Sequence, residues 1–446
     1  MNDQTYRNRV CEVIIKTKAI PAFYNDVSNI ATLHNQLHDQ DGLLQNQDAS
    51  LKHARDYAII GCVELGSAGR EYAFTSAALF NLNAAVEMTL FNGKRPFITG
   101  GEQIGPETGN PENFQTFDEF WSAFETQLKW LIQRAIDLNN ILGKTHQKIL
   151  PTPLLSCFID GPMEKGQDII FGGARYNSSG FTHIAFADVC DSLNAIEDAV
   201  FKEKNVTMQE MIEAVNANFK APWDKSLLPY LKNKAPKFGT EDPIAVKNSQ
   251  NLIKLLYGFY QQHTNYRGGK YRPAFWTMTN HAGQGKISEA LPSGRKARTV
   301  FSSGITPTSQ CAPELTTALG AVAKLSLNPE QCSEYIPGGV ALNIKYTPEG
   351  NNGNYLKKFG DIIEAYFKQG GMQIQFNVQT YKTLIDAKKH PEKEEYSQLI
   401  VRVSGYSAYF KDLNNAMKDE LITRSQYNLF TGQLVPLPES FKEGGE

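Results

Sequence analysis

One glycine, Gly405, lies in the nine-residue run VRVSGYSAY at 401–409, among residues typical of a strand. Glycine inside a strand costs backbone entropy and contributes no side-chain packing, so it usually marks a bulge, a bend or a close approach of another group. We see no structural advantage for glycine in this run, and we interpret Gly405 as a chemical residue that another group approaches. The Cα of a glycine can lose a hydrogen atom and hold the unpaired electron, because the flanking amide nitrogen and carbonyl delocalise it and no side chain prevents planarity.

A thiol and a carboxylate form the second candidate site, Cys62-Val63-Glu64, at the end of an apolar segment. In an extended segment residues i and i+2 point to the same side, so Cys62 and Glu64 would face one pocket together. The alternative is a small buried core cysteine beside a surface-paired glutamate, and on the tripeptide alone this alternative is the stronger one.

Apolar spacing and turn residues predict the elements that position these groups. Thr116 and Glu119 form a capping-box pattern ahead of a long amphipathic helix that reaches about Leu142. The alternation of elements predicts α/β architecture, with a sheet or barrel inside helices and a loosely ordered tail after Phe430. Other predicted helices cover 51–57, 77–90, 191–202 and 356–369, and predicted strands or extended segments cover 10–20, 58–64, 274–279, 373–378 and 399–403.

The composition is that of a globular protein without a strongly charged surface. The chain has 446 residues, 41% of them hydrophobic, and 45 Lys plus Arg nearly balance 47 Asp plus Glu. This excludes a nucleic-acid groove and a membrane-binding surface, and favours a small molecule or another protein as partner. We expect a cytoplasmic protein, because residues 1–20 lack the unbroken apolar core of a signal peptide. The six cysteines form no CxxC pair and the eight histidines no HExxH pattern, so we predict reduced thiols and no metal site.

The two sites together resemble those of the glycyl radical enzymes, the pyruvate formate-lyase-like family. Gly61-Cys62-Val63-Glu64 and the C-terminal glycine run occur in the family's order. The resemblance covers about 10–430 and implies part of a ten-stranded α/β barrel, with helices outside and the cysteine and glycine loops inside. Other segments that resemble the family's loops and core strand are 177–180, 279–283, 292–295, 303–307 and 370–377.

The resemblance implies a division of labour between the two sites in anaerobic metabolism. Gly405 would store a radical that a radical S-adenosylmethionine activating enzyme installs, with no other cofactor bound. A thiyl radical on Cys62 would remove a hydrogen from the substrate, because it attacks C–H bonds that a glycyl radical is too stable to attack. Hydrogen transfer requires van der Waals contact, so both loops must meet in a water-free cavity. Glu64, buried beside the thiol, would have a raised pKa and act as general base or acid.

The residues around Cys62 favour the dehydratases and related lyases of the family. Pyruvate formate-lyase has two adjacent cysteines, whereas Val63 follows Cys62 here, so a formate acetyltransferase would be one in name only. The dehydratases have a Trp-His-Asp run shortly after the cysteine, whereas this chain has Ala-Phe-Thr-Ser-Ala at 73–77. Radical aryl-acetate decarboxylation or addition to fumarate therefore stays open. A non-catalytic, radical-carrying repair subunit is a further alternative, although Glu64 and a complete cysteine loop argue against it.

The remaining candidate residues have supporting roles. Thr75, Ser76 and His281 are possible substrate contacts, and His281 is explained better as a hydrogen-bonded structural histidine. Arg402, Ser404 and Tyr406 would support the radical loop, with Arg402 anchored through an ion pair.

The resemblance corresponds only to the C-terminal portion of the family's longer chains. It assigns 1–330 to the C-terminal half-barrel with the cysteine loop and 331–446 to a glycyl radical domain. A half-barrel alone would expose unpaired strand edges and an open radical cavity. We therefore expect an N-terminal-half polypeptide that closes the barrel, or else a sequence that is a fragment of one longer protein. A homo- or hetero-oligomer and contact with the activating enzyme are expected as well.

Overall fold

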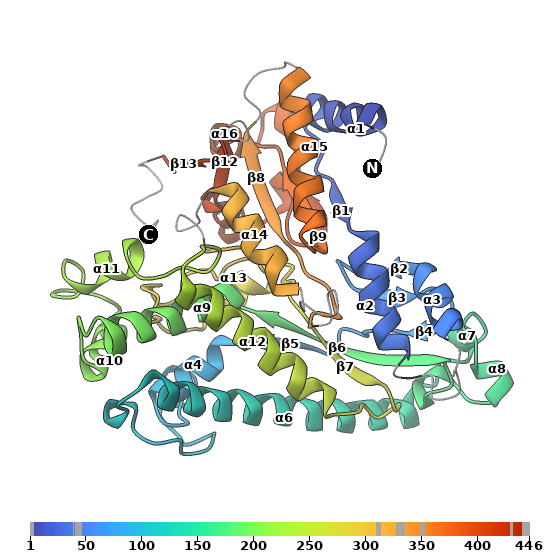
Figure 1. Ribbon diagram of the computed structural model, residues 1–446, viewed down its shortest axis with the longest axis horizontal. Helices are drawn as coiled ribbons and strands as arrows, with labels where there is room; N and C mark the ends of the chain where they lie inside the picture. Colours follow the sequence, from blue (N-terminus) through green and yellow to red (C-terminus); the bar gives the residue numbers. More distant parts are fainter. Residues whose placement is uncertain are drawn as a thin grey trace.

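The computed structural model describes residues 4–38, 40, 47–308, 314–326, 335–347, 353–428 and 431–438. Strands lie inside a layer of helices in a mixed α/β arrangement (Figure 1), which confirms the predicted fold class. The strands are β1 Ala22–Tyr24, β2 Tyr57–Ile59, β3 Leu65–Ser67, β4 Glu71–Tyr72, β5 Ala78–Asn81, β6 Tyr176–Ile184, β7 Lys270–Ala274, β8 Asn343–Thr347, β9 Gln373–Asn377, β10 Ile400–Arg402, β11 Ser407–Tyr409, β12 Gln426–Asn428 and β13 Leu434–Val435.

The helices cover one face of the strands and both ends of the molecule (Figure 1). They are α1 Gln4–Thr17, α2 Asp26–His38, α3 Gln47–Arg55, α4 Asn83–Leu90, α5 Pro96–Thr99, α6 Phe117–Ile149, α7 Pro153–Ser156, α8 Pro162–Lys165, α9 Phe186–Ala195, α10 Met208–Asn216, α11 Leu227–Asn233, α12 Pro243–Gln261, α13 Asn280–Lys286, α14 Leu315–Ser326, α15 Gly353–Lys368, α16 Tyr381–Lys389 and α17 Asn415–Thr423.

Parallel strands form one continuous array across two sheets. β6 pairs in parallel with β4, β5 and β7, and β8 pairs in parallel with β9. A parallel bridge between Phe275 and Val340, just outside β7 and β8, connects the two sheets. The order is therefore β4 and β5, then β6, β7, β8 and β9, as expected for half of a ten-stranded barrel. β1 pairs with the far edge of β9 in the antiparallel direction.

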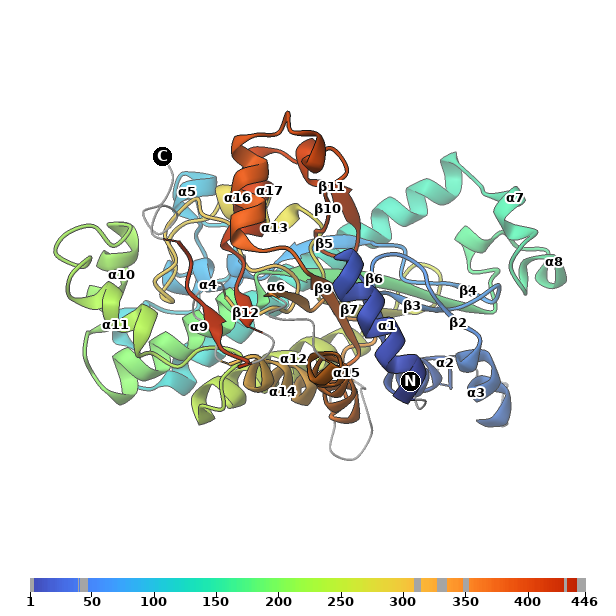
Figure 2. The same ribbon diagram turned by 90° about the horizontal axis from the view of Figure 1, so that it is seen from above.

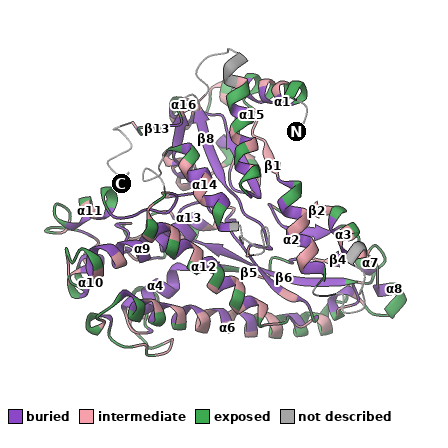
Figure 3. Cartoon of the chain, in the orientation of Figure 1, coloured by how far each residue is buried: buried purple, intermediate pink, exposed green. Residues whose placement is uncertain are grey.

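Side chains of the array alternate between a face covered by helices and an inner face. On the helix side, Phe181 packs edge-on against Tyr260 of α12 and Phe376 against Phe359 of α15. β6 and β8 are buried along most of their length, whereas α6 is buried on one side only (Figure 3). The inner face holds Gly180, Ala274, Asn343, Gln375 and Asn377, of which the last three take part in the hydrogen bonds around the glycine turn.

Several predicted elements agree with the structure. The Thr116 hydroxyl accepts a hydrogen bond from Glu119 N at 3.3 Å and caps α6, which continues to Ile149. The predicted segments 356–369, 373–378 and 399–403 correspond to α15, β9 and β10. The segment 191–202 is helical, with α9 followed by a π-helix over Ile196–Lys202. Of the tail after Phe430, only 431–438 lie within the described residues.

Other predictions are wrong, for identifiable reasons. The segment 10–20, predicted as a strand, belongs mainly to helix α1, because Arg7, Cys11, Ile14 and Ile15 form one buried helical face. Arg7 also pairs with Asp361 of α15 at 2.8 Å. The segment 77–90 divides into β5 and α4, and 58–64 is a strand only as far as Ile59. The strand predicted at 274–279 lies earlier in the chain, at β7. Because β7 contains charged residues, its sequence lacks the apolar run on which the prediction was based.

Candidate active site

Gly405 occupies the turn between β10 and β11. Arg402 and Ser407 stand opposite each other at the end of this antiparallel pair, and Val403 N donates a hydrogen bond to Tyr406 O at 2.9 Å. Gly405 has a φ of +88°, a conformation that glycine adopts without steric cost. The expectation that glycine has no structural advantage here is therefore wrong, because the turn itself requires it.

The same turn brings Gly405 against Cys62. A Cβ added at Gly405 would lie 2.5 Å from Cys62 Sγ and closer still to Cys62 Cβ. No side chain fits between the two residues, so the predicted close approach at Gly405 is present in addition to the turn. Contact between a glycine Cα and a thiol is the arrangement that direct hydrogen transfer requires.

The Cys62 thiol is half-buried and keeps its hydrogen at neutral pH. Burial, together with the charge of Glu64, raises the pKa of Cys62 to about 11, against the smaller opposing effect of the Arg402 guanidinium. A thiolate has no hydrogen to give, so the raised pKa favours the form that can donate a hydrogen atom to a radical.

Glu64 is buried, but not in the way that the sequence predicts. Cys62 and Val63 form a bend rather than a strand, and the Glu64 carboxylate folds back to accept a hydrogen bond from Val63 N at 2.7 Å. A Cβ added at Gly61 would lie 2.6 Å from Glu64 Oε2, so glycine at this position makes room for the carboxylate. Burial raises the pKa of Glu64, against the effect of its backbone hydrogen bonds. On the other side, Tyr24 Oη donates to Cys62 O at 2.9 Å.

Arg402 holds the glycine turn through hydrogen bonds. Its Nη2 donates to Gly405 O at 3.1 Å, its Nη1 to Ser407 Oγ at 3.3 Å, and its Nε to Gln375 Oε1 at 2.8 Å. The ion pair expected for Arg402 is not formed within the described part of the chain. Neutral oxygens of the turn and of β9 take its place.

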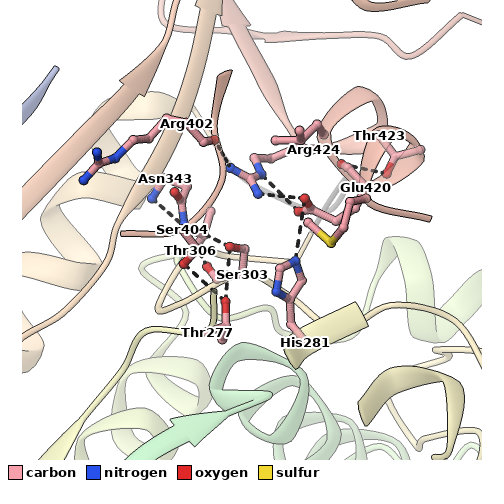
Figure 4. Close-up of polar contacts among 12 residues, drawn as sticks. Thr277, His281, Ser303, Thr306, Asn343, Arg402, Ser404, Glu420, Thr423 and Arg424 are labelled. Carbon is pink, nitrogen blue, oxygen red and sulfur yellow. Dashed lines mark hydrogen bonds and ion pairs between the residues drawn. The ribbon is translucent and has the colours of Figure 1, made fainter. Parts of the chain in front are cut away.

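The opposite side of the turn is held by Ser404. Ser404 is fully buried, and its hydroxyl accepts a hydrogen bond from Thr277 Oγ1 at 3.2 Å (Figure 4). Thr277 lies 3.5 Å from the Ser303 hydroxyl, which accepts from Asn343 Nδ2 at 3.0 Å. Asn343 Oδ1 in turn accepts from Gln375. Sequence analysis missed this chain of polar side chains, although 303–307 and 370–377 stood out as segments similar to the family.

His281 lies in a buried ionic cluster rather than beside the thiol. Its Nε2 is 3.6 Å from Glu420 Oε2, and Arg424 Nη2 binds the same oxygen at 2.7 Å (Figure 4). Burial alone would raise the pKa of Glu420, but the charges of Arg424 and His281 lower it to about 2. Tyr406 belongs to a neighbouring apolar cluster with Val403 and Met417. Neither ring nitrogen of His281 has a hydrogen-bond partner among the described residues, so both interpretations of His281, structural histidine and substrate contact, stay predictions.

The predicted substrate contacts Thr75 and Ser76 are exposed and lie between β4 and β5. Both have positive φ angles, 56° and 44°. Their neighbour Phe74 turns inward instead and packs in a buried cluster with Val63 and Trp276, against which the thiol side chain rests. A buried apolar cluster that contains two aromatic side chains, next to the cysteine loop, is therefore a feature that sequence analysis did not assign.

The described residues contain neither a cluster of metal ligands nor a helix able to span a membrane. No group of three or more His, Cys, Asp or Glu side chains there is placed to hold a metal ion. None of the described helices combines the length and the apolar character needed to cross a membrane.

Comparison with known proteins gives consistent matches. Two family models match, "Pyruvate formate lyase-like" over residues 1–285 and "Glycine radical" over residues 301–411. The trans-4-hydroxy-L-proline dehydratase of Clostridioides difficile is 33% identical over 95% of this chain and 51% of its own length. The (2S)-3-sulfopropanediol dehydratase of Klebsiella oxytoca is 30% identical over 91% and 47%. The glycerol-bound, B12-independent glycerol dehydratase of Clostridium butyricum superposes with a TM-score of 0.85 and 32% identity, over 96% of this chain and 51% of that chain. The chain spans about half the length of the relatives it matches.

Proposed function

The chain belongs to the pyruvate formate lyase-like family and contains a glycine radical domain, and on this premise we propose that it is the C-terminal catalytic half of a glycyl radical dehydratase or lyase. The observation that supports this most directly is the contact of Gly405 with Cys62, where an added Cβ would lie 2.5 Å from the sulfur. The matched dehydratases act, by their names, on small hydroxylated molecules. We propose that this chain also acts on a small molecule, one that loses a leaving group in the reaction.

The proposed reaction moves one hydrogen atom at a time. Cys62 gives its S–H hydrogen to the Gly405 radical, which leaves a thiyl radical on Cys62. The thiyl radical takes a hydrogen from a substrate carbon, and the substrate radical expels its leaving group. The product radical takes the hydrogen back from Cys62, and Cys62 recovers a hydrogen from Gly405. Each hydrogen transfer breaks one bond to hydrogen and forms another, and the elimination step breaks the bond to the leaving group while the unpaired electron stays on the product, so the radical returns to Gly405 after every turnover.

Glu64 is the proposed acid–base group. Removal of a proton from a hydroxyl next to the substrate radical lowers the barrier to loss of the leaving group, and burial, which raises the pKa of Glu64, makes its carboxylate a stronger base for this step. Its burial next to the thiol loop supports this role. We propose that Arg402, Ser404 and Tyr406 support the turn that contains Gly405. Thr75 and Ser76 are exposed, so we propose them as substrate contacts only if another polypeptide also holds part of the substrate.

A second reaction class is favoured by one observation. The cluster against which Cys62 packs contains Phe74 and Trp276, and residues 73–77 have no His-Asp pair for substrate hydroxyls. Apolar surroundings of this kind favour an apolar or aromatic substrate, as in radical decarboxylation of an aryl acetate or addition to fumarate. A non-catalytic repair subunit is the weaker alternative, because it would need neither the thiol loop nor Glu64.

Partners and organisation complete the proposal. We propose an N-terminal-half polypeptide, or the missing part of a longer chain, that closes the barrel, and a radical S-adenosylmethionine enzyme that activates Gly405 in the cytoplasm. We also keep the division into 1–330 and 331–446 as a proposal.

Anaerobic activation followed by electron paramagnetic resonance tests the function. We expect a doublet from the remaining α-hydrogen of Gly405, and growth with 2-¹³C-glycine should split it further. The labelling needs no substitution, which matters because Gly405→Ala would also strain the turn. Cys62→Ser should keep the doublet and abolish turnover. Exposure to oxygen should cut the backbone at Gly405. A sample with a verified radical that stays intact in air, or turnover by Cys62→Ser, would contradict the proposal.

A further inference from the structure

We infer that Asn377 is a positioning residue for hydrogen transfer between Cys62 and Gly405, an inference that rests on the proposed function. Asn377 touches neither of these residues. It acts on Arg402, three positions before the glycine, and so determines where the turn stands relative to the thiol.

The radical hairpin consists of β10, β11 and the turn that contains Gly405. On the outer edge of β10, the side chain of Asn377 forms the two backbone hydrogen bonds that a neighbouring strand would otherwise form. Its Nδ2 donates to Arg402 O at 2.8 Å, and its Oδ1 accepts from Arg402 N at 2.8 Å. In an antiparallel pair, every second residue directs its N–H and C=O away from the neighbouring strand. Arg402 is such a residue of β10, and its outward amide and carbonyl both meet the Asn377 side chain. Asn377 is only 3% exposed, so water does not compete for these bonds.

A second residue of β9 fixes the side chain of the same arginine. Gln375 lies two residues before Asn377, on the same face of the strand, and accepts a hydrogen bond from Arg402 Nε at 2.8 Å. The far end of the guanidinium reaches Gly405 O at 3.1 Å. One strand, β9, thus fixes both the backbone and the side chain of Arg402. Because the guanidinium also binds Gly405 O, the position of Arg402 determines the position of the glycine turn.

The turn is held from the other side as well, by the bond between Ser404 and Thr277. The two attachments, at Arg402 and at Ser404, both lie within three residues of Gly405, which must exchange a hydrogen with Cys62. Hydrogen transfer falls off steeply when the reacting atoms move out of contact. Release of the β9 attachment should therefore leave Gly405 able to hold a radical but displaced from Cys62.

The fold should survive loss of the Asn377 side chain. The hairpin contributes Val401 and Phe410 to an apolar cluster with Tyr381 and Leu421, and this cluster does not include Asn377. Arg424 Nη1 also lies 3.5 Å from Arg402 O and can occupy part of the vacated site.

Isotope exchange at Gly405 measures the transfer directly. The thiol hydrogen of Cys62 exchanges with water, so in D₂O each return transfer places deuterium on Gly405. When repeated transfers also replace the one α-hydrogen that remains on the radical carbon, the resonance doublet of Gly405 collapses to a narrow singlet, because deuterium couples more weakly to the electron than hydrogen does. The rate of this collapse reports transfer between sulfur and carbon, whereas the initial size of the doublet reports loading of the radical.

The experiment compares Asn377→Ala and Asn377→Asp with wild type in the activated full chain. Alanine removes both hydrogen bonds, and aspartate keeps the acceptor while losing the donor. We expect the doublet to form in both variants and to collapse at least tenfold more slowly. Asn110→Ala, which removes an exposed cap of a short helix ahead of α6, is the matched control and should exchange at the wild-type rate.

The outcomes separate this inference from the proposed function. Collapse at the wild-type rate in both Asn377 variants overturns the inference and leaves the function standing. Absence of a doublet in both variants, with wild-type circular dichroism, also overturns it, because Asn377 would then serve loading and not transfer. Absence of a doublet in the wild type, under conditions that activate a dehydratase of the family, rejects the proposed function itself.

Discussion

Gly61 and Gly258 have opposite surroundings and provide a test of the Glu64 position. A Cβ at Gly61 would meet the Glu64 carboxylate at 2.6–2.8 Å, whereas a Cβ at Gly258, on the exposed side of α12, would meet no atom within 4 Å. We expect Gly61→Ala to displace the carboxylate and lower kcat at least tenfold while the radical doublet persists. Gly258→Ala should keep full activity and add about 0.5–1 kcal/mol of stability, as alanine does in helices. Equal activity of both variants would remove Glu64 from the proposed mechanism.

The pH dependence of turnover follows from two raised pKa values. Burial raises the pKa of Glu64, so as a general base it becomes active only above the usual range of a glutamate, and kcat/KM should rise with pH through that raised value. Burial also raises the pKa of Cys62 to about 11, so the rate should fall as the thiol hydrogen is lost near that pH. Glu64→Gln should abolish the acidic limb and keep the alkaline one. A profile unchanged by this substitution would contradict the base role.

At the scale of elements, α17 is anchored by buried ions. Glu420 pairs with Arg424 inside the protein, and Lys345 Nζ donates to the carbonyls of Leu421 and Ile422 at 2.9 and 2.7 Å. The lysine provides hydrogen-bond donors for backbone carbonyls at the C-terminal end of α17. This helix packs behind the hairpin formed by β10 and β11, which contains Gly405. β10, β11, α16 and α17 stand together above the array (Figure 2), so the anchors connect this group to the inner face of the strands.

Loss of one partner of the Glu420 pair should therefore be costly. We expect Glu420→Gln to lower the free energy of unfolding by about 3–5 kcal/mol, because it leaves the Arg424 charge buried without compensation. The pKa of Glu420 falls from an ordinary 4.5 to about 2 on folding. Its contribution is thus complete above pH 4.5 and disappears as the pH decreases toward 2. Denaturant unfolding at pH 7 and pH 3 measures both effects, and equal differences between variant and wild type at the two pH values would argue against the linkage.

The elements show which parts of the fold could be predicted from sequence. α6, β9 and β10 follow from local apolar spacing and caps, and the structure contains them. α1 was missed because a β-branched run hides a buried face that also includes a charged residue, Arg7. β7 was missed for a similar reason, since its central Arg272 is buried in a pair with Glu71 at 2.7 Å.

The candidate site divides in the same way. Gly405 and Cys62 could be found because each stands in a short local motif. Thr277, Ser303, Asn343 and Asn377 could not, because each is an ordinary polar residue in its own segment. Only the array brings these four segments to one inner face, and no local spacing reports that they meet.

At the scale of the whole molecule, one projecting arm has an exposed apolar surface. The second half of α6, with α7 and α8, extends away from the body (Figure 2), and Leu142, Ile149, Leu154, Phe158 and Met163 are 58–75% exposed there. An apolar surface of this kind associates with other surfaces in water. We expect the isolated chain to self-associate in a concentration-dependent way.

Sedimentation velocity of a Leu154→Lys, Phe158→Lys double variant tests this expectation. The two charges should shift the chain toward a monomer with little effect on its melting temperature, since neither side chain is buried. Glu164→Lys, in the neighbouring helix α8, changes charge without removing an apolar group and serves as control. A wild-type chain that is monomeric at all concentrations would exclude the arm as a contact surface.

The Cβ that cannot be added at Gly405 also defines a stereochemistry. In an L-residue the Cβ occupies the place of the pro-S hydrogen of glycine, and it is this place that lies against Cys62 Sγ. The two prochiral hydrogens of Gly405 are therefore inequivalent: the pro-S atom faces the sulfur and the pro-R atom points elsewhere. Deuterium delivered by the thiol should therefore enter the pro-S position in the first transfer, and collapse of the doublet in D₂O would show that the remaining hydrogen also reaches the sulfur in later transfers.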